Sequence, residues 1–294
     1  MRINYHEHAF QVSPLLKGDE LDNVENSIKE FQDLLESGFE GYVEATPLFL
    51  GRNLIGLSRL IEQTKLNIFP VTGFHHSGHY SENLQKDVTD KGVDFWAESL
   101  SKELSHGMAV DEECYLNKSE PNRSEIKAKV FKIGLKNPIG RFEQFVLNIA
   151  QKVYLQNEIP IMVHLDGDSN LQEIAKIIID LGIKPKNVAL AHIDRQVNFK
   201  LFMDLTELGF FLGFDSFIRT SQSESNKLFE AVVKFPDHVL IGGDLARSSR
   251  YISYGGSPGI KYTGNVVVPK IRQLASEDLL KKVLEENPNR WLNS

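Results

Sequence analysis

Residues 141–165 read RFEQFVLNIAQKVYLQNEIPIMVHL, and this stretch contains the pattern of one helix followed by one strand. Apolar side chains recur at helical spacing from Arg141 to Asn157, which predicts an amphipathic helix. The apolar run from Ile159 to Leu165 is typical of a buried strand, and its first polar side chain is His164. A helix and a strand in close succession are the repeating unit of α/β folds with a parallel sheet.

The same alternation of strand-like and helix-like segments continues through the whole sequence. The first strand is expected at the N-terminus and ends at His6-Glu7-His8. Further strands are expected at residues 41–46, 66–74, 124–135, 159–165, 188–193, 210–214 and 239–243. Helices are expected at residues 23–38, 54–65, about 88–104, 141–157, 171–181, 199–208, 225–234, 267–274 and 276–286. Each expected strand is therefore followed by a helix.

Eight successive strand and helix units favour a (β/α)8 TIM barrel, in which helices surround a closed parallel sheet. The main alternative is a doubly wound open sheet, which would usually carry a glycine-rich phosphate loop after its first strand. This sequence has no such loop there, and no linker rich in Gly, Ser or Pro divides it. We therefore expect one α/β barrel domain over residues 1–294.

The composition argues against several classes of partner. The 33 basic and 40 acidic residues give a net charge of −7, and no run of Lys and Arg interrupts this balance, so nucleic acid and anionic membranes are not expected partners. One cysteine, Cys114, excludes an internal disulfide and a thiolate zinc site. The sequence shows no apolar run typical of a signal peptide or a membrane span. We expect a cytoplasmic protein that acts on a small molecule.

Polar residues suited to metal binding follow several of the apolar strand segments. In a barrel, catalytic residues lie at the carboxyl ends of the strands. His6 and His8 lie at the end of the first strand and are expected to share one face, because alternate strand residues point the same way. His164, His192 and Asp244 close three further strands. One such residue is commonplace at a strand end, but His and Asp at four strand ends indicate a metal site.

A lysine occupies an unusual position in the strand expected at residues 124–135. Phe131, Ile133 and Leu135 share one face and are expected to contact the helices, so Lys132 points into the barrel. Burial and nearby metal ions would both disfavour its charge. A neutral lysine amine could react with carbon dioxide to form a carbamate that bridges two metals. The alternative is a solvated Lys132 beyond the end of the strand.

An ordered set of motifs covers essentially the whole sequence. The motifs are His6-Glu7-His8, Thr46-Pro47 with Gly51-Arg52-Asn53, Thr72-Gly73-Phe74, Phe131-Lys132-Ile133-Gly134, Ile161-Met162-Val163-His164, Ala191-His192-Ile193-Asp194-Arg195, Gly243-Asp244 and Glu286-Asn287-Pro288. Together they resemble the phosphotriesterase-related branch of the amidohydrolase superfamily. Residues 247–259 resemble its phosphotriesterase-like lactonases. The sequence departs from the family pattern at Tyr5, Asn53 and His75-His76, and the last departure affects the expected substrate preference.

The resemblance implies a (β/α)8 hydrolase with two divalent metal ions. The ligands it implies are His6, His8 and Asp244 for the more buried metal, His164 and His192 for the more exposed metal, and carbamylated Lys132 as the bridge. It also implies attack by a metal-bridging hydroxide, with Asp244 as the catalytic residue that takes up the proton. Zinc is the expected metal, while manganese, cobalt and iron also suit His and carboxylate ligands. The family makes a homodimer plausible.

The substrate is expected to be a lactone, either a sugar lactone or a phosphorylated sugar lactone. Arg219, Arg250, Tyr251 and Tyr254 follow the last two strands, where arginine could bind an anionic group bidentately. His75 is a further candidate substrate contact at the mouth of the barrel. The alternative is that they are ordinary solvated loop residues, and we expect this to hold for about half of them.

Other interpretations remain open at this stage. Phosphotriester hydrolysis would use the same metals, and a metal-binding protein without catalysis is a second alternative. The pair Asp194-Arg195 would either orient the site from behind the ligands or form a simple structural ion pair. His76 and His79 have no carboxylate nearby in sequence, so we do not expect them to form another metal site.

Overall fold

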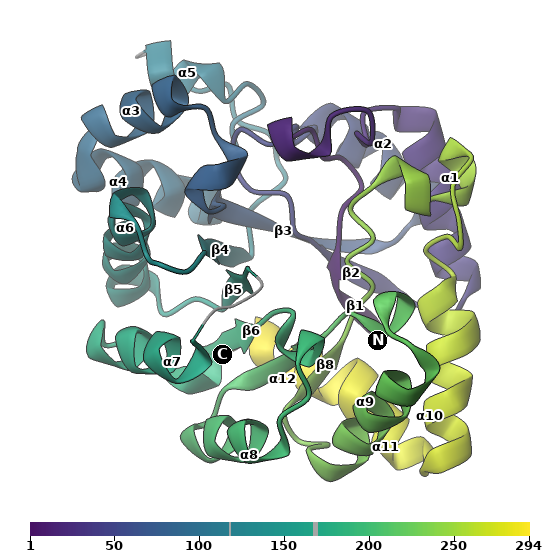
Figure 1. Ribbon diagram of the computed structural model, residues 1–294. Helices are drawn as coiled ribbons and strands as arrows, with labels where there is room; N and C mark the ends of the chain where they lie inside the picture. Colours follow the sequence, from purple (N-terminus) through teal and green to yellow (C-terminus); the bar gives the residue numbers. More distant parts are fainter. Residues whose placement is uncertain (118, 167–169) are drawn as a thin grey trace.

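The computed structural model describes residues 1–117, 119–166 and 170–294, and its strands form one eight-stranded sheet in the order β1 to β8 (Figure 1). All the sequential pairs of strands are parallel. The strands are β1 Ile3–Glu7, β2 Gly41–Glu44, β3 Asn67–Phe74, β4 Val130–Leu135, β5 Ile161–Leu165, β6 Val188–Leu190, β7 Phe211–Phe214 and β8 Val239–Ile241. The backbone N–H of Asp244 donates to the carbonyl of His6 at 3.0 Å, which joins the last strand to the first. The predicted (β/α)8 barrel is confirmed.

Helices surround the sheet, and most begin at a residue that caps their exposed N–H groups. They are α1 Val24–Glu36, α2 Leu54–Thr64, α3 Glu82–Asp90, α4 Gly92–Ser105, α5 Glu113–Asn117, α6 Arg141–Asn157, α7 Leu171–Asp180, α8 Phe199–Leu208, α9 Gln222–Lys234, α10 Val268–Leu274, α11 Glu277–Lys281 and α12 Asn287–Leu292. Asn53, one of the departures from the family pattern, accepts a hydrogen bond from the N–H of Gly56 at 2.8 Å. Its position is therefore that of a helix N-cap.

Several predicted boundaries were wrong. The helix expected near residues 88–104 falls in two helices, because the chain turns at Lys91 between them and Gly92, the first residue of α4, adopts a φ of +82°. The strand expected at 124–135 begins only at Val130, since Ser124 instead donates to the carbonyl of Met108. The short helix α5 was not predicted. Strands β6 and β8 end two or three residues earlier than expected.

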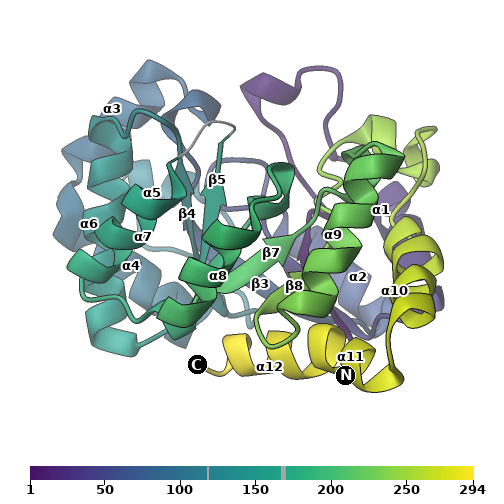
Figure 2. The ribbon, with the colours of Figure 1, turned by 60° about the horizontal axis from the view of Figure 1, so that its bottom comes forward.

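The interior of the barrel is filled from strands and from the C-terminal helix α12. Tyr5, Met162 and Phe211 belong to one buried cluster that also contains Trp291 of α12. The indole N–H of Trp291 donates to the carbonyl of Asn187 at 3.2 Å. In Figure 2, α11 and α12 lie at the bottom of the barrel together with both chain termini. This end is therefore closed by packing, which leaves the carboxyl ends of the strands for the site.

Within residues 1–117, 119–166 and 170–294, no helix is both long enough and apolar enough to cross a membrane.

Candidate metal centre

His6, His8 and Asp244 meet at the junction of β1 and β8. One potential ligand atom from each lies within 4.8 Å of the other two. Oδ1 of Asp244 lies 3.5 Å from Nε2 of His6 and 3.6 Å from Nε2 of His8. All three residues are buried. The structure therefore brings together the residues expected to hold the more buried metal.

His192 and His164 lie beside this group. Nε2 of His192 is 2.7 Å from Nδ1 of His164, and Nδ1 of His192 is 3.7 Å from Oδ2 of Asp244. These contacts connect the two residues expected at the exposed metal with the three expected at the buried one, through Asp244. The side chains expected as ligands from four strand ends thus form one continuous group.

Lys132 lies inside the barrel, not in solvent. Its side chain is fully buried, and its Nζ donates to the carbonyl of Ala45 at 2.7 Å. Burial lowers the pKa of Lys132 to about 8, although the charges of Asp244 and Glu44 act in the opposite direction. The expected inward direction of this side chain is observed. The lowered pKa increases the neutral fraction of the amine, and the neutral amine is the form that reacts with carbon dioxide.

Irregular backbone, and not simple strand alternation, aims several of these side chains. The pairing register of β1 with β2 shifts between Asn4 and Glu7, and both Tyr5 and His6 reach the barrel interior. His192 and Asp244 have left-handed backbone with φ values of 62° and 44°. Such conformations are unfavourable for residues other than glycine and are concentrated at functional sites.

Asp215, which follows β7, is the main residue that the sequence reasoning missed. Its carboxylate accepts from Nδ1 of His192 at 2.6 Å and contacts Nδ1 of His6 at 3.2 Å. The hydroxyl of Tyr5 also donates to it. Burial alone would raise the pKa of Asp215, but the two imidazoles hold it below its ordinary value. Asp215 is the first polar residue after an apolar strand, which is the signal that identified the other candidates.

Thr46 fixes His8 in a comparable way. Its hydroxyl donates to the carbonyl of Phe10 at 2.6 Å, so its oxygen accepts from Nδ1 of His8 at 2.7 Å. A neutral imidazole with a proton on Nδ1 keeps its lone pair on Nε2. Burial lowers the pKa of His8 to about 3 and also lowers that of His6, so both remain neutral. His6, His8 and His192 each have Nδ1 held by an oxygen acceptor, as metal-binding histidines usually do.

A buried nitrogen without a partner tests whether these residues suit a cation. Among the described residues, Nε2 of His6 has no hydrogen-bond partner although it is buried. Burial would raise the pKa of Asp244, but Arg219 and the nearby imidazoles hold it well below the ordinary value, so this carboxylate is ionised. An available lone pair beside an ionised carboxylate fits a divalent metal.

Arg219 and Arg250 lie on the loops above β7 and β8. Nη2 of Arg219 donates to Oδ2 of Asp244 at 2.6 Å, which places its guanidinium directly beside the predicted ligands. Nη1 of Arg250 donates to the carbonyl of Leu245 at 3.3 Å. Burial and then the charge of Arg219 lower the pKa of Arg250.

The structure places Tyr251 and Tyr254 differently from the prediction of substrate contacts. Tyr251 is completely buried, and its hydroxyl donates to the carbonyl of His8 at 2.7 Å. The hydroxyl of Tyr254 donates to the carbonyl of Asn23 at 2.8 Å. Both side chains fasten the loop after β8 to the N-terminal part of the barrel, and Tyr251 supports the backbone at His8.

Asp194 and Arg195 form no ion pair with each other in the part of the chain that the structure describes. Asp194 accepts from the N–H of Ser216 at 2.7 Å and from its hydroxyl at 3.0 Å, and burial followed by the charge of Asp215 raises its pKa to about 8. Nη1 of Arg195 donates to the carbonyl of Leu165 at 3.3 Å. These contacts tie together the loops after β5, β6 and β7, behind His192.

His75 lies near His164, with ring centroids 4.2 Å apart.

Comparison with known proteins gives a family for this arrangement. The family model described as "Phosphotriesterase family" matches residues 3–292. This chain belongs to the phosphotriesterase family. The expected resemblance is thereby confirmed over nearly the whole length.

Three relatives illustrate the range of this family. A phospho-furanose lactonase of Mycoplasmopsis synoviae is 27% identical, over 92% of this chain and 80% of the relative. An N-acetyltaurine hydrolase of Danio rerio is 23% identical, over 98% of this chain and 83% of the relative. The crystal structure of the phosphotriesterase homology protein of Escherichia coli, with phosphate in its active site, superposes with a TM-score of 0.85 at 22% identity, over 99% of this chain and 98% of that one. The structural likeness supports the same barrel fold.

Proposed function

We propose that this chain is a metal-dependent hydrolase that opens a lactone ring, with a sugar lactone or a phosphorylated sugar lactone as its substrate. Its family makes it a hydrolase of ester or amide bonds. The lactonase relative supports the choice of a cyclic ester. The lactone, the use of two metals and the roles of individual residues are our proposal.

One observation carries the proposal: three imidazoles, those of His6, His8 and His192, each have Nδ1 at an oxygen acceptor, and Nε2 of the first two lies within 3.6 Å of the ionised carboxylate of Asp244. His6, His8 and Asp244 would hold one divalent ion, and His164 with His192 would hold a second. Carbamylated Lys132 would bridge them. Divalent ions bound there, zinc or one of manganese, cobalt and iron, would polarise a carbonyl oxygen and make water a nucleophile near neutral pH.

The protein side chains would orient the reaction and move its proton. Asp244 is the proposed catalytic residue, because its carboxylate lies at the centre of the predicted ligands. It would take the proton of the attacking water and pass it to the ring oxygen that leaves when the C–O bond breaks. Arg219 holds Oδ2 of this carboxylate at 2.6 Å and fixes its direction. Asp215 and Thr46 fix the orientations of the histidines.

Positive charge near the centre supports an anionic substituent on the substrate. Arg219 contacts Asp244, but Arg250 makes no ion pair with any residue that the structure describes. A cavity of about 520 Å³ adjoins Arg219 and is also lined by the basic Arg195 and Lys227 and by the acidic Asp194 and Glu224. Guanidinium groups pair with phosphate bidentately. A phosphorylated lactone would therefore be favoured over a long-chain acyl lactone, whose tail requires an apolar channel.

The test is a panel of steady-state rates with the metal-loaded protein. The panel contains sugar lactones with and without a phosphate group, an acyl homoserine lactone, N-acetyltaurine and paraoxon. We expect the highest kcat/KM for a sugar lactone, and loss of turnover in Asp244→Asn with the fold intact by circular dichroism. Absence of turnover for every lactone at full metal loading would falsify the proposal.

The same panel separates the alternatives. A higher rate on paraoxon would make the chain a phosphotriester hydrolase. The N-acetyltaurine hydrolase relatives give a specific reason to include an amide, and preference for N-acetyltaurine would assign amide hydrolysis. Stable metal binding without turnover of any compound would support a metal-binding protein without catalysis.

The arginine assignment has its own test. Arg250→Gln should raise KM for the phosphorylated lactone about tenfold and leave KM for the unphosphorylated lactone unchanged. Arg247→Gln is the matched control, because Arg247 already pairs with Asp19 at 3.3 Å. Equal effects of Arg250→Gln on both lactones would contradict a role in anion recognition.

A further inference from the structure

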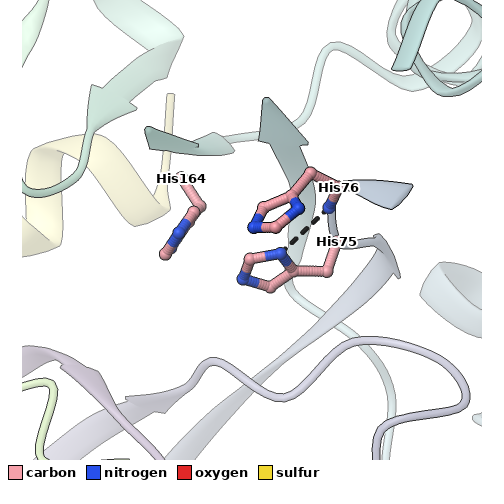
Figure 3. A group of neighbouring side chains, drawn as sticks. All are labelled: His75, His76 and His164. Carbon is pink, nitrogen blue, oxygen red and sulfur yellow. Dashed lines mark hydrogen bonds between the residues drawn. The ribbon is translucent and has the colours of Figure 1, made fainter. Parts of the chain in front are cut away.

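A second group of histidines lies beside the predicted metal centre. One ring nitrogen from each of His75, His76 and His164 lies within 4.8 Å of the other two (Figure 3). The ring of His79 is also close, with its centroid 3.8 Å from that of His75. Three imidazoles at this spacing would ordinarily suggest a further metal site. Their hydrogen bonds point to a different use.

Gly134 of β4 allows the segment after β3 to reach β5. Gly134 pairs in register with His164, and a Cβ atom at residue 134 would collide with the backbone of His75 and His76. The N–H of His75 donates to the hydroxyl of Tyr80 at 2.8 Å, which fixes the start of this segment. The approach of His75 to His164 is therefore a built feature of the barrel mouth.

The backbone determines the protonation of His75 and His76. Nδ1 of His75 accepts from the N–H of His76 at 2.9 Å, and Nδ1 of His76 accepts from the N–H of Gly78 at 3.2 Å. A neutral imidazole has one lone pair, so each of these rings carries its proton on Nε2. A metal would need that Nε2 lone pair, with Nδ1–H donating elsewhere. His75 and His76 thus have the tautomer opposite to that of His8.

His75 presents a donor that no described residue satisfies. Its side chain is 2% exposed, and within the described residues Nε2 has no hydrogen-bond partner. Nε2 of His76, in contrast, lies 4.0 Å from the carboxylate of Asp166. In Figure 3 the ring of His75 extends toward His164, which we expect at the exposed metal. Nε2 of His75 is not among the fully buried atoms that lack a partner, so this N–H remains accessible to a ligand oxygen at the mouth of the barrel.

We propose that Nε2–H of His75 donates a hydrogen bond to a substrate oxygen next to His164, and that these histidines do not hold a third metal. This inference rests on the proposed function, because it places the reacting carbonyl or the product oxyanion beside His164. The donor moves no proton and breaks no bond. It stabilises negative charge on the oxygen, as preorganised donors do in other hydrolases.

The tautomer can be measured without any substrate. In protein labelled with ¹⁵N at histidine, long-range ¹H–¹⁵N spectra distinguish a proton on Nε2 from one on Nδ1, and His75→Gln identifies the signal. We expect the proton on Nε2 of His75. A proton on Nδ1 would overturn the proposal, because Nε2 would then be free for a metal.

Binding of inorganic phosphate tests the donor itself, by calorimetry on the zinc-reconstituted protein. His75→Phe keeps an aromatic ring without a donor, and His75→Gln keeps an N–H without the ring. We expect binding about tenfold weaker in His75→Phe and near wild-type binding in His75→Gln. His106→Gln, at an exposed position, is the control. Unchanged binding in His75→Phe, or no phosphate binding by the wild type, would overturn the proposal.

Two further results complete the test. Metal analysis should give the same zinc content for wild type and His75→Phe, whereas one ion fewer in the variant would identify a third metal site. Turnover separates this proposal from the proposed function. If no lactone is hydrolysed but the phosphate and tautomer results hold, the lactonase assignment fails and the donor at His75 stands.

Discussion

Asp215 and His192 are joined by a hydrogen bond of 2.6 Å between a carboxylate oxygen and Nδ1, in the buried centre of the barrel. The same carboxylate contacts Nδ1 of His6, so one side chain orients histidines from β1 and from the loop after β6. The orientation keeps Nε2 of both rings for another partner. Asp215 is therefore a positioning residue for the predicted metal centre.

Replacement of Asp215 tests this relationship. Asp215→Asn should weaken metal binding about 10- to 100-fold, because an amide fixes two imidazoles less well than a carboxylate. Metal titration with a competing chelator measures the effect. Asp237→Asn, which alters an exposed carboxylate paired with Lys282, is the control. Equal metal affinity in wild type and Asp215→Asn would remove the positioning role.

Lys132→Met should separate stability from function. Removal of a fully buried amine should stabilise the metal-free protein by about 1 kcal/mol or more at neutral pH, although the carbonyl of Ala45 loses its donor. The same change should abolish hydrolysis, because methionine cannot form the bridging carbamate. Urea unfolding in the presence of chelator and turnover with metal give the two measurements. Full activity in Lys132→Met would exclude the bridging role.

The pH dependence of the Lys132 effect has a defined sign. The pKa of Lys132 is about 8 in the folded protein, against 10.5 ordinarily. Between these values the unfolded chain binds a proton that the folded chain does not, so stability rises with pH. The metal-free wild type should have a lower free energy of unfolding than Lys132→Met. This difference should be largest below pH 8 and should decrease as the pH rises from 8 towards 10.5. A difference that stays constant over this range would contradict the shift.

A buried ion pair behind the site should contribute strongly to stability. Arg52 donates to both carboxylate oxygens of Glu103 at 2.8 Å, and its Nε lies 2.7 Å from Glu112. Arg52→Ala would leave the buried Glu103 and the largely buried Glu112 without their cation and should destabilise the protein by about 3 to 5 kcal/mol. Arg59→Ala removes an exposed pair with Glu25 and should change stability by less than about 1 kcal/mol. Similar losses in the two variants, measured by urea unfolding, would refute this ranking.

Tyr251→Phe distinguishes support of the backbone from contact with substrate. Loss of the hydrogen bond to the carbonyl of His8 should destabilise the protein by about 1 to 1.5 kcal/mol. Thermal unfolding measures this change. Tyr262→Phe is the matched control, because within the described residues the hydroxyl of Tyr262 has no hydrogen-bond partner. A raised KM without loss of stability in Tyr251→Phe would restore the predicted substrate contact.

Local patterns in the sequence were sufficient to predict the barrel and most of its elements. The helix at Arg141–Asn157 was predicted at its observed bounds, because its apolar spacing and flanking residues are local signals. The break at Gly92 was missed, since apolar spacing on both sides of it resembles one continuous helix. The strand predicted at residues 124–135 was too long at its start. Residues 124–128 have the polar and apolar alternation of a strand, but their backbone groups bond to segments outside the sheet.

The candidate site was predictable where an apolar strand ends in a polar residue. That rule found His164, His192 and Asp244. It also fits Asp215, which directly follows the strand expected at residues 210–214 but was not among the predicted site residues. It cannot predict which atom of a histidine carries the proton. That depends on acceptors such as Thr46, which lies 38 residues from His8 in sequence.

The sequence alone determined the order of strands and helices, because hydrophobic periodicity and capping act over a few residues. It also determined which polar residues would lie at the carboxyl edge of the sheet. The tertiary structure decided their directions, since the irregular β1 and the left-handed His192 and Asp244 depend on contacts between distant strands. It also decided that Tyr251 is buried and that His75 reaches His164 across Gly134, because close packing between nonconsecutive segments sets both.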